Sequence, residues 1–365
     1  MGRRPAEMRV TIVHDDPIFE PSWADRFYEF LGDRNVQVLR VGTDDPRAVA
    51  SITDTHGLMW RFTHSPQSQG IAKPILSSIE LGLQLPVWPN FATRWHYDDK
   101  IAQFYLLHAM RAPIPETFAF YDKERALGWA ESTSYPVVFK LSGGASSQSV
   151  CLVESRDAAG RLIERAFSRG LSASHDLDDI AQGRLRPPWL RLRALLSDLS
   201  KEAAHSLHLG PSHLYEPRVS MRWPIEFGRV LFQEFLPKNA FDYRITVIGA
   251  RAFGFRRFNR PNDFRASGSG LIDFDPRQID LEAVRIAQDI SARGRFQSMA
   301  FDLLRAPDAK LRIVEISYTF VGTAVQQCPG YWDDRLNWHD GHVWPQDAIA
   351  EDFLSALTFQ TAASR

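Results

Sequence analysis

Apolar and polar residues alternate in two ways along the N-terminal part of the chain. Helical spacing of apolar residues at 21–31 and 71–83 predicts two helices. Short apolar runs between and around them predict strands at residues 9–14, 36–41, 57–62 and 85–88. Strands that alternate with helices are typical of a parallel sheet. The pattern therefore predicts an N-terminal α/β domain over residues 8–95.

The pattern changes after a helix that we expect at about 98–110. Strands, a helix and a Gly/Ser-rich turn follow up to residue 153, and a mostly helical insertion is expected over about 156–228. Antiparallel-looking strands begin at residue 229, with helices at about 280–293 and 345–357. We therefore expect two α+β subdomains, over residues 96–228 and 229–360.

A hairpin near the C-terminal end carries two acidic residues. If Asp308 and Ala309 form a tight turn, Asp302 lies opposite Glu315, with side-chain roots roughly 5 Å apart. Like charges in this position destabilise a hairpin, and a divalent cation held by the carboxylates would compensate them. Mg²⁺ bound in this way normally also takes phosphate oxygens. The alternative is a solvated hairpin whose acids are screened by water.

The Gly/Ser-rich turn combines groups that suit the phosphates of a nucleotide. A strand ends at Lys140, and the turn that follows contains Gly143, Gly144, Ser146 and Ser147. Glycines let backbone N–H groups approach an anion, while hydroxyl groups and the ammonium group add donors and charge. The turn lacks the spacing of a Walker A loop. A flexible hairpin with an incidental lysine is the alternative interpretation.

Two further segments carry candidate binding groups. Glu234 ends an apolar strand just before Leu236 and a proline, which leaves backbone groups that can hydrogen-bond an adenine; a solvent-facing glutamate is the alternative. Arginines follow among phenylalanines and beside a Gly/Ser turn, where they suit a phosphate or a carboxylate. They are Arg244, Arg256, Arg257, Arg260 and Arg265.

Composition narrows the class of protein. The 365 residues have a net charge of −1, which argues against a general nucleic-acid or membrane-surface binder. No apolar run approaches about 18 residues, and no secretory signal is evident at the start. Two cysteines far apart suit a reducing cytoplasm. We expect a cytoplasmic protein with neither nucleic acid nor membrane as a partner, and we consider a homodimer.

In their order along about residues 85–320, these segments resemble the ATP-grasp superfamily of carboxylate–amine ligases. The resemblance is closest to the branch of D-alanine–D-alanine ligases and glutamate-adding ligases. It implies the ATP-grasp fold, in which an N-terminal α/β domain precedes two α+β subdomains that enclose the nucleotide. It also implies ATP and Mg²⁺ as cofactors.

The resemblance implies a role for each candidate residue. Lys100, which follows Asn90 and Asp99, resembles a phosphate-contacting lysine, and Lys140 with Gly143, Gly144, Ser146 and Ser147 resembles the phosphate-covering loop. Glu234 and the backbone at Leu236 would hold adenine. Asp242, two residues before Arg244, resembles the acid of the family's acid-x-Arg strand and is implied as a further cofactor-binding residue. The catalytic arginines implied are Arg244 and Arg265, and the metal ligands implied are Asp302, Glu315 and Ser317. The family has asparagine where this chain has Ser317 and Ser267.

The activity implied is an ATP-dependent ligase. The γ-phosphoryl group of ATP would pass to a substrate carboxylate, and an amine would attack the acyl phosphate, giving an amide, ADP and phosphate. A phosphotransferase on the same fold and a nucleotide-binding protein without catalysis are the alternatives. The partners expected are a small-molecule carboxylate and an amine, with amino acids, peptides and sugar acids as candidate classes.

Overall fold

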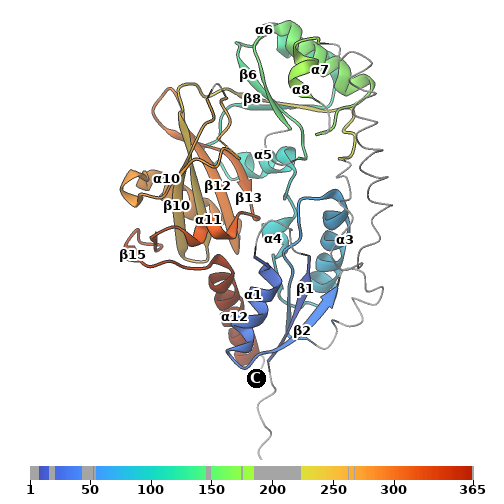
Figure 1. The fold of residues 1–365 in the computed structure, drawn as a ribbon. Coiled ribbons are helices and arrows are strands. Elements are labelled where there is room, and N and C mark those ends of the chain that lie inside the picture. Colours follow the sequence, from blue (N-terminus) through green and yellow to red (C-terminus); the bar gives the residue numbers. More distant parts are fainter. Residues whose placement is uncertain are drawn as a thin grey trace, which may run out of the picture. The chain divides into compact units, whose positions relative to one another are not determined.

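The computed structural model describes most of the chain (Figure 1). The described residues are 8–15, 21–42, 52, 55–144, 149–173, 176–184, 223–261, 263–266 and 268–363. They fall into two compact units, with boundaries between Thr117 and Phe118 and between Phe235 and Leu236. In the part of the chain so described, no helix is long and apolar enough to cross a membrane.

The first unit begins with the parallel sheet that the alternating pattern predicts. Its strand order is β2-β1-β3-β4, and every pairing is parallel. The strands are β1 (Arg9–His14), β2 (Gln37–Gly42), β3 (Gly57–Met59) and β4 (Val87–Trp88). The helices are α1 (Trp23–Gly32), α3 (Pro66–Ser77), the π-helical turn η1 (Ser78–Gly82), α4 (Phe91–Arg94) and α5 (Lys100–Ala109). The α/β class expected for this region is confirmed.

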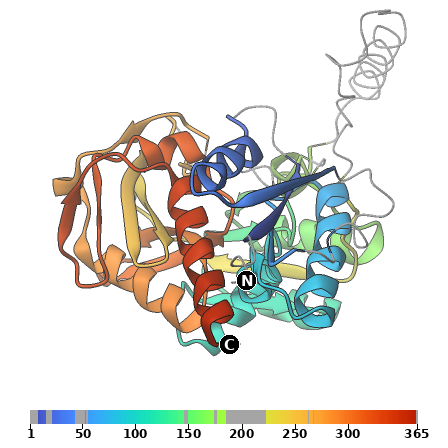
Figure 2. The same ribbon diagram turned by 90° about the horizontal axis from the view of Figure 1, so that it is seen from below.

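The same unit contains a seven-stranded antiparallel sheet, with order β13-β12-β9-β10-β14-β15 and β11 paired to β10. Its strands are β9 (Phe241–Ile248), β10 (Arg251–Phe258), β11 (Ile272–Asp273), β12 (Ser298–Arg305), β13 (Leu311–Ser317), β14 (Gly330–Trp332) and β15 (Trp338–Asp340). Its helices are η2 (Pro276–Gln278), α10 (Leu281–Gly294), α11 (Gly322–Gln326) and α12 (Pro345–Ala363). Helix α10 packs on the central strands, and α12 lies beside α1 (Figures 1 and 2).

One apolar core joins the two sheets of the first unit. The segment after β13 enters it, because Phe320 contacts the ring of Trp23 and Tyr318 contacts that of Trp88. The hydroxyl group of Tyr318 donates to the carbonyl of Phe62 at 2.7 Å. These contacts fix the end of β13 against the N-terminal sheet.

The second unit has a smaller sheet and a core of its own. The sheet order is β5-β8-β6-β7, from β5 (Thr117–Phe120), β6 (Val137–Lys140), β7 (Val150–Val153) and β8 (Val230–Glu234). Its helices are α6 (Lys123–Ser132), α7 (Arg156–Ser168) and α8 (Leu177–Ala181). The predicted insertion over 156–228 begins with α7 and α8, and residues 185–222 of it lie outside the described residues.

Candidate nucleotide and metal site

The acidic hairpin pairs as predicted, but through a different turn. Asp302 on β12 is the partner of Glu315 on β13. The loop is closed by the N–H of Ala306, which donates to the carbonyl of Lys310 at 2.8 Å, so it is one residue longer than a tight turn at Asp308–Ala309. A β-bulge next to Asp302 shifts the register by one residue and restores the predicted pairing.

Two arginines, one on β9 and one on β10, bind the Asp302 carboxylate. Arg244, its partner on β9, donates through Nε to Oδ1 and through Nη2 to Oδ2, the latter at 2.8 Å. Arg257 on β10 lies with Nη2 2.8 Å from Oδ2 of Asp302. It also forms a two-pronged pair with Asp242, at 2.9 and 2.5 Å. The result is a buried network of two carboxylates and two guanidinium groups across three strands.

The pKa values of Asp302 and Asp242 are shifted in opposite directions within this network. Burial acts to raise the pKa of Asp302, but the guanidinium groups of Arg244 and Arg257 outweigh it and hold that pKa below its usual value. Burial raises the pKa of Asp242, and the Asp302 carboxylate adds to this against the attraction of Arg257. Asp302 therefore remains ionised at neutral pH, as a metal ligand must.

The like charges on the hairpin are compensated by these cationic side chains. Glu315, whose side chain is 43% exposed, lies with Oε1 4.0 Å from Nζ of Lys100. The pairing of Asp302 with Glu315 therefore does not by itself require a divalent cation, contrary to the argument from the sequence. A metal is instead indicated by the oxygen donors that lie around Glu315.

The donor atoms fit Mg²⁺. Ser317 shares a strand face with Glu315, and its hydroxyl group donates to the carbonyl of Thr319 at 2.8 Å, which leaves oxygen lone pairs available. Among the described residues, no three or more His, Cys, Asp or Glu side chains are grouped so that they could hold a metal ion by themselves. Carboxylate and hydroxyl oxygens with an incomplete shell suit a cation that takes its remaining ligands from water and phosphate, as Mg²⁺ does. The assignment of Asp302, Glu315 and Ser317 as ligands stays a prediction.

The segment before α5 has mainly structural roles, apart from its lysine. Asp99 caps α5 by accepting from the N–H groups of Ile101 and Ala102, which fixes Lys100 as the first helical residue. Asn90 caps α4 through the N–H of Thr93. Lys100 is buried, with 7% of its side chain exposed, and is directed at Glu315. A buried lysine beside a candidate metal ligand is consistent with the predicted phosphate contact.

In the second unit, Lys140 is the last residue of β6 and the glycine turn follows it. Gly144 has φ +107°, and a Cβ there would lie 2.9 Å from side-chain carbons of Ala173 and Ser149. This position therefore requires glycine. Ser146 and Ser147 lie outside the described residues.

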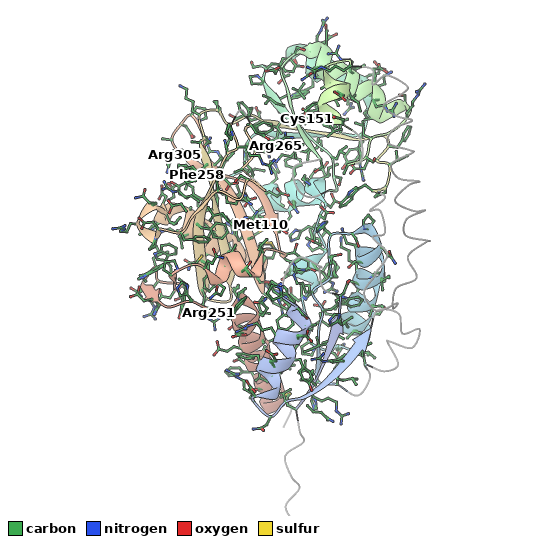
Figure 3. The ribbon with its side chains drawn as sticks, in the orientation of Figure 1. Met110, Cys151, Arg251, Phe258, Arg265 and Arg305 are labelled. Carbon is green, nitrogen blue, oxygen red and sulfur yellow. The ribbon has the colours of Figure 1, made fainter. Side chains whose placement is uncertain are left out.

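The residues predicted to bind adenine and the γ-phosphate lie in the following positions. Glu234 ends β8 as the partner of Val137. Leu236 is buried, and its carbonyl accepts from Asn239 Nδ2 at 3.2 Å. Arg265 (Figure 3) pairs with Asp263, at 2.9 Å between Nε and Oδ1. Asn262 and Ser267, on either side of it, lie outside the described residues.

The structure thus brings together in the first unit Lys100, Asp242, Arg244, Asp302, Glu315 and Ser317. It shows Arg257 as a central member, which the sequence had presented only as one arginine of a set. It also shows a residue with no sequence signal, Glu226, whose carboxylate accepts from the N–H groups of Ser142 and Gly143.

Comparison with known proteins gives matches to solved structures only. No protein-family model and no curated protein sequence matches the chain. The crystal structure of a RimK domain ATP-grasp protein from Sphaerobacter thermophilus matches with a TM-score of 0.54 and 17% identity, over 95% of this chain and 99% of that one. The ATP-grasp ligase PsnB, complexed with a minimal precursor, matches with a TM-score of 0.54 and 13% identity, over 96% and 99%.

A third match is to the macrocyclase MdnC from Microcystis aeruginosa, bound with its precursor peptide. Its TM-score is 0.52 at 14% identity, over 95% of this chain and 100% of that one. Identities this low establish an architecture and leave activity open. The matches cover nearly the whole of each chain. The chain has the ATP-grasp fold.

Proposed function

We propose that the chain is an ATP-dependent carboxylate–amine ligase that acts through an acyl phosphate and releases ADP and phosphate. The fold and the order of the candidate residues support this proposal. The structurally similar proteins include ligases, a macrocyclase and a D-cycloserine synthetase.

The buried charge network carries the argument. Asp302 has 6% of its side chain exposed, and Arg257 has 11%. Replacing a buried ion pair with apolar residues is often neutral or stabilising, so stability alone is a weak reason to place such groups in a sheet. Strongly perturbed ionisable groups gather at functional sites. Here they lie beside oxygen donors that suit Mg²⁺.

The roles proposed for the residues follow from their chemistry. Asp302 and Glu315, with Ser317, would hold Mg²⁺, which supplies neutralisation of phosphate charge when bound. Arg244 would stabilise charge on the transferred phosphoryl group, and Arg257 would keep Asp302 ionised and oriented.

In the same proposal, lysines and loop amides bind the nucleotide. Lys100 and Lys140 neutralise phosphate oxygens, and the amides of the loop at Gly143 and Gly144 donate to them. Glu234 and the backbone at Leu236 hold the adenine. Arg265 binds near the γ-phosphate. None of these roles requires a nucleophilic side chain, since catalysis rests on positioning and electrostatics.

The substrates proposed are a carboxylate and an amine of small molecules or peptides. The PsnB and MdnC structures contain precursor peptides, which supports a peptide among the candidates. Amino acids and sugar acids are the other classes that we propose to test.

The test is incubation with ATP, Mg²⁺ and pools of amino acids, peptides and sugar acids. ADP, free phosphate and a new amide detected by mass spectrometry are expected. ADP with a phosphorylated product and no free phosphate would instead identify a phosphotransferase. Absence of Mg·ATP binding at millimolar concentration would refute both enzymatic functions.

A further inference from the structure

Two consecutive backbone amides of the glycine turn already bind an anion that belongs to the chain. The N–H of Ser142 donates to Oε2 of Glu226 at 2.9 Å, and the N–H of Gly143 donates to Oε1 at 2.8 Å. Each carboxylate oxygen accepts one amide, and hydrogen bonds to an ionised acceptor are the stronger kind. The side chain of Glu226 is only 10% exposed, so water competes little for this contact.

The position of Glu226 is set by elements outside the turn. Its backbone pairs with Leu171 through two hydrogen bonds of 2.9 and 2.6 Å. Gly170, with φ +74°, permits this approach, because a Cβ there would lie 2.8 Å from the carbonyl oxygen of Glu226 and 2.3 Å from a methyl carbon of Ile225. The segment that follows α7 therefore fixes the backbone of Glu226, so that its carboxylate is held at the turn.

The chemistry of this contact is that of a phosphate site. Successive amides that converge on one oxyanion form a concave anion site of the kind that binds phosphate. The guanidinium group of Arg229 adds positive charge, with Nε 3.4 Å from Oε2 of Glu226. The two carboxylate oxygens stand where two oxygens of a phosphate would be accepted.

We propose that Glu226 determines the anion specificity of the glycine turn, because its carboxylate competes with phosphate for the amides of Ser142 and Gly143. This inference rests on the proposed function, in which the turn binds the phosphates of ATP. A weakly charged anion gains too little from two amides to displace a tethered carboxylate. A polyphosphate carries more charge and more acceptor oxygens, and it displaces Glu226.

A purely structural role for Glu226 makes the opposite prediction. If its carboxylate only braces the turn, removing it loosens the amides and lowers the affinity for every anion. If the carboxylate competes, only a fraction of the molecules have the amides of Ser142 and Gly143 available for a ligand. Removing Glu226 raises this fraction to one, so the affinity for anions rises by the inverse of the original fraction.

The experiment compares the full-length chain with Glu226→Ala and Glu226→Gln. Glu164→Gln is the matched control, because Glu164 is a half-exposed glutamate of the same unit that pairs with Lys123. Calorimetry measures the binding of ADP, tripolyphosphate and inorganic phosphate. Hydrogen exchange of residues 137–143 without nucleotide reports the state of the amides and of strand β6.

We expect faster exchange at Ser142 and Gly143 in Glu226→Ala, unchanged exchange in strand β6, and about tenfold tighter binding of ADP and tripolyphosphate. We expect inorganic phosphate to gain at least as much, so that the preference for polyphosphate narrows. If ADP binds but its affinity is unchanged or lower in both Glu226 variants, the competition is refuted and the proposed function stands. If neither the wild-type chain nor any variant binds ADP at millimolar concentration, the proposed function and this inference are both refuted.

Discussion

The two acids of the hairpin have different environments, and this predicts a separation between stability and activity. Asp302 is nearly buried and bound by two guanidinium groups, whereas the side chain of Glu315 is 43% exposed and lies 4.0 Å from its lysine partner. If both acids hold Mg²⁺, Asp302→Asn and Glu315→Gln each abolish turnover. Only Asp302→Asn should also destabilise the chain in the absence of nucleotide.

The magnitude follows from the partners. Removing one member of a buried ion pair costs about 3–5 kcal/mol, because the other charge stays buried. Arg257 retains Asp242 in the variant, so the loss falls mainly on Arg244, and we expect about 3 kcal/mol for Asp302→Asn. Lys100 is buried, but its partner Glu315 is 43% exposed and 4.0 Å away, so the pair is weak, and Glu315→Gln should cost only about 1 kcal/mol.

The assay is urea unfolding followed by tryptophan fluorescence, which reports on the first unit through Trp23, Trp60 and Trp88 of its core. Asp289→Asn is the matched control, because that carboxylate is 56% exposed and pairs only with Arg293 on the same helix among the described contacts. Equal stability of Asp302→Asn and Glu315→Gln would refute the view that the arginines hold Asp302. Unchanged turnover in both variants would refute the metal assignment.

Three further predictions address other positions. Ser317→Asn should keep at least about a tenth of the wild-type turnover, since an amide oxygen replaces the hydroxyl as a ligand; complete loss of turnover would contradict this. Burial lowers the pKa of His96 from 6.5 to about 4. As the pH falls, His96 is therefore protonated in the unfolded chain before it is protonated in the folded one. The free energy of unfolding should decrease by about 3 kcal/mol between pH 7 and pH 4. Urea unfolding across this range should show a flatter dependence for His96→Phe, and an equally steep one would disprove the assignment. Gly144→Ala should weaken ADP binding, because the left-handed backbone and two contacts at 2.9 Å leave no room for a methyl group. The control Gly160→Ala, where a Cβ meets nothing within 4 Å, should bind ADP normally in calorimetry.

Local pairing is the part of the site that the sequence determines. The hairpin of β9 and β10 turns at Gly249 and Ala250, and counting outward from this turn places Arg257 opposite Asp242, as observed. The alternation of strands and helices likewise predicts the parallel N-terminal sheet. The loop of the β12–β13 hairpin was predicted one residue too short, and no sequence signal revealed the bulge beside Asp302 that restores the register.

Contacts between segments far apart in the sequence cannot be predicted by counting residues outward from a turn. Arg244 and Asp302 are 58 residues apart, and α10, which lies between their strands in the sequence, packs on both of these strands. Gly143 and Glu226 are 83 residues apart, and Glu226 stands in a segment without a strong strand or helix pattern. Register between non-consecutive strands depends on tertiary packing, which propensity and periodicity do not encode.

These distant contacts share a physical purpose. A chain that concentrates charge for a divalent cation and a polyphosphate has to fold before either ligand arrives, and buried charges without partners are too costly for that. Here the carboxylate proposed for the cation is bound by guanidinium groups, and the amides proposed for phosphate are bound by a carboxylate. In the glycine turn, the internal partner Glu226 has the same sign of charge as the phosphate that would replace it, whereas Arg244 and Arg257 are proposed to stay beside Asp302 when Mg²⁺ binds. The affinity of the turn for phosphate is then the difference between two similar interactions, so Glu226 variants should change that affinity without altering the two amides that bind the phosphate.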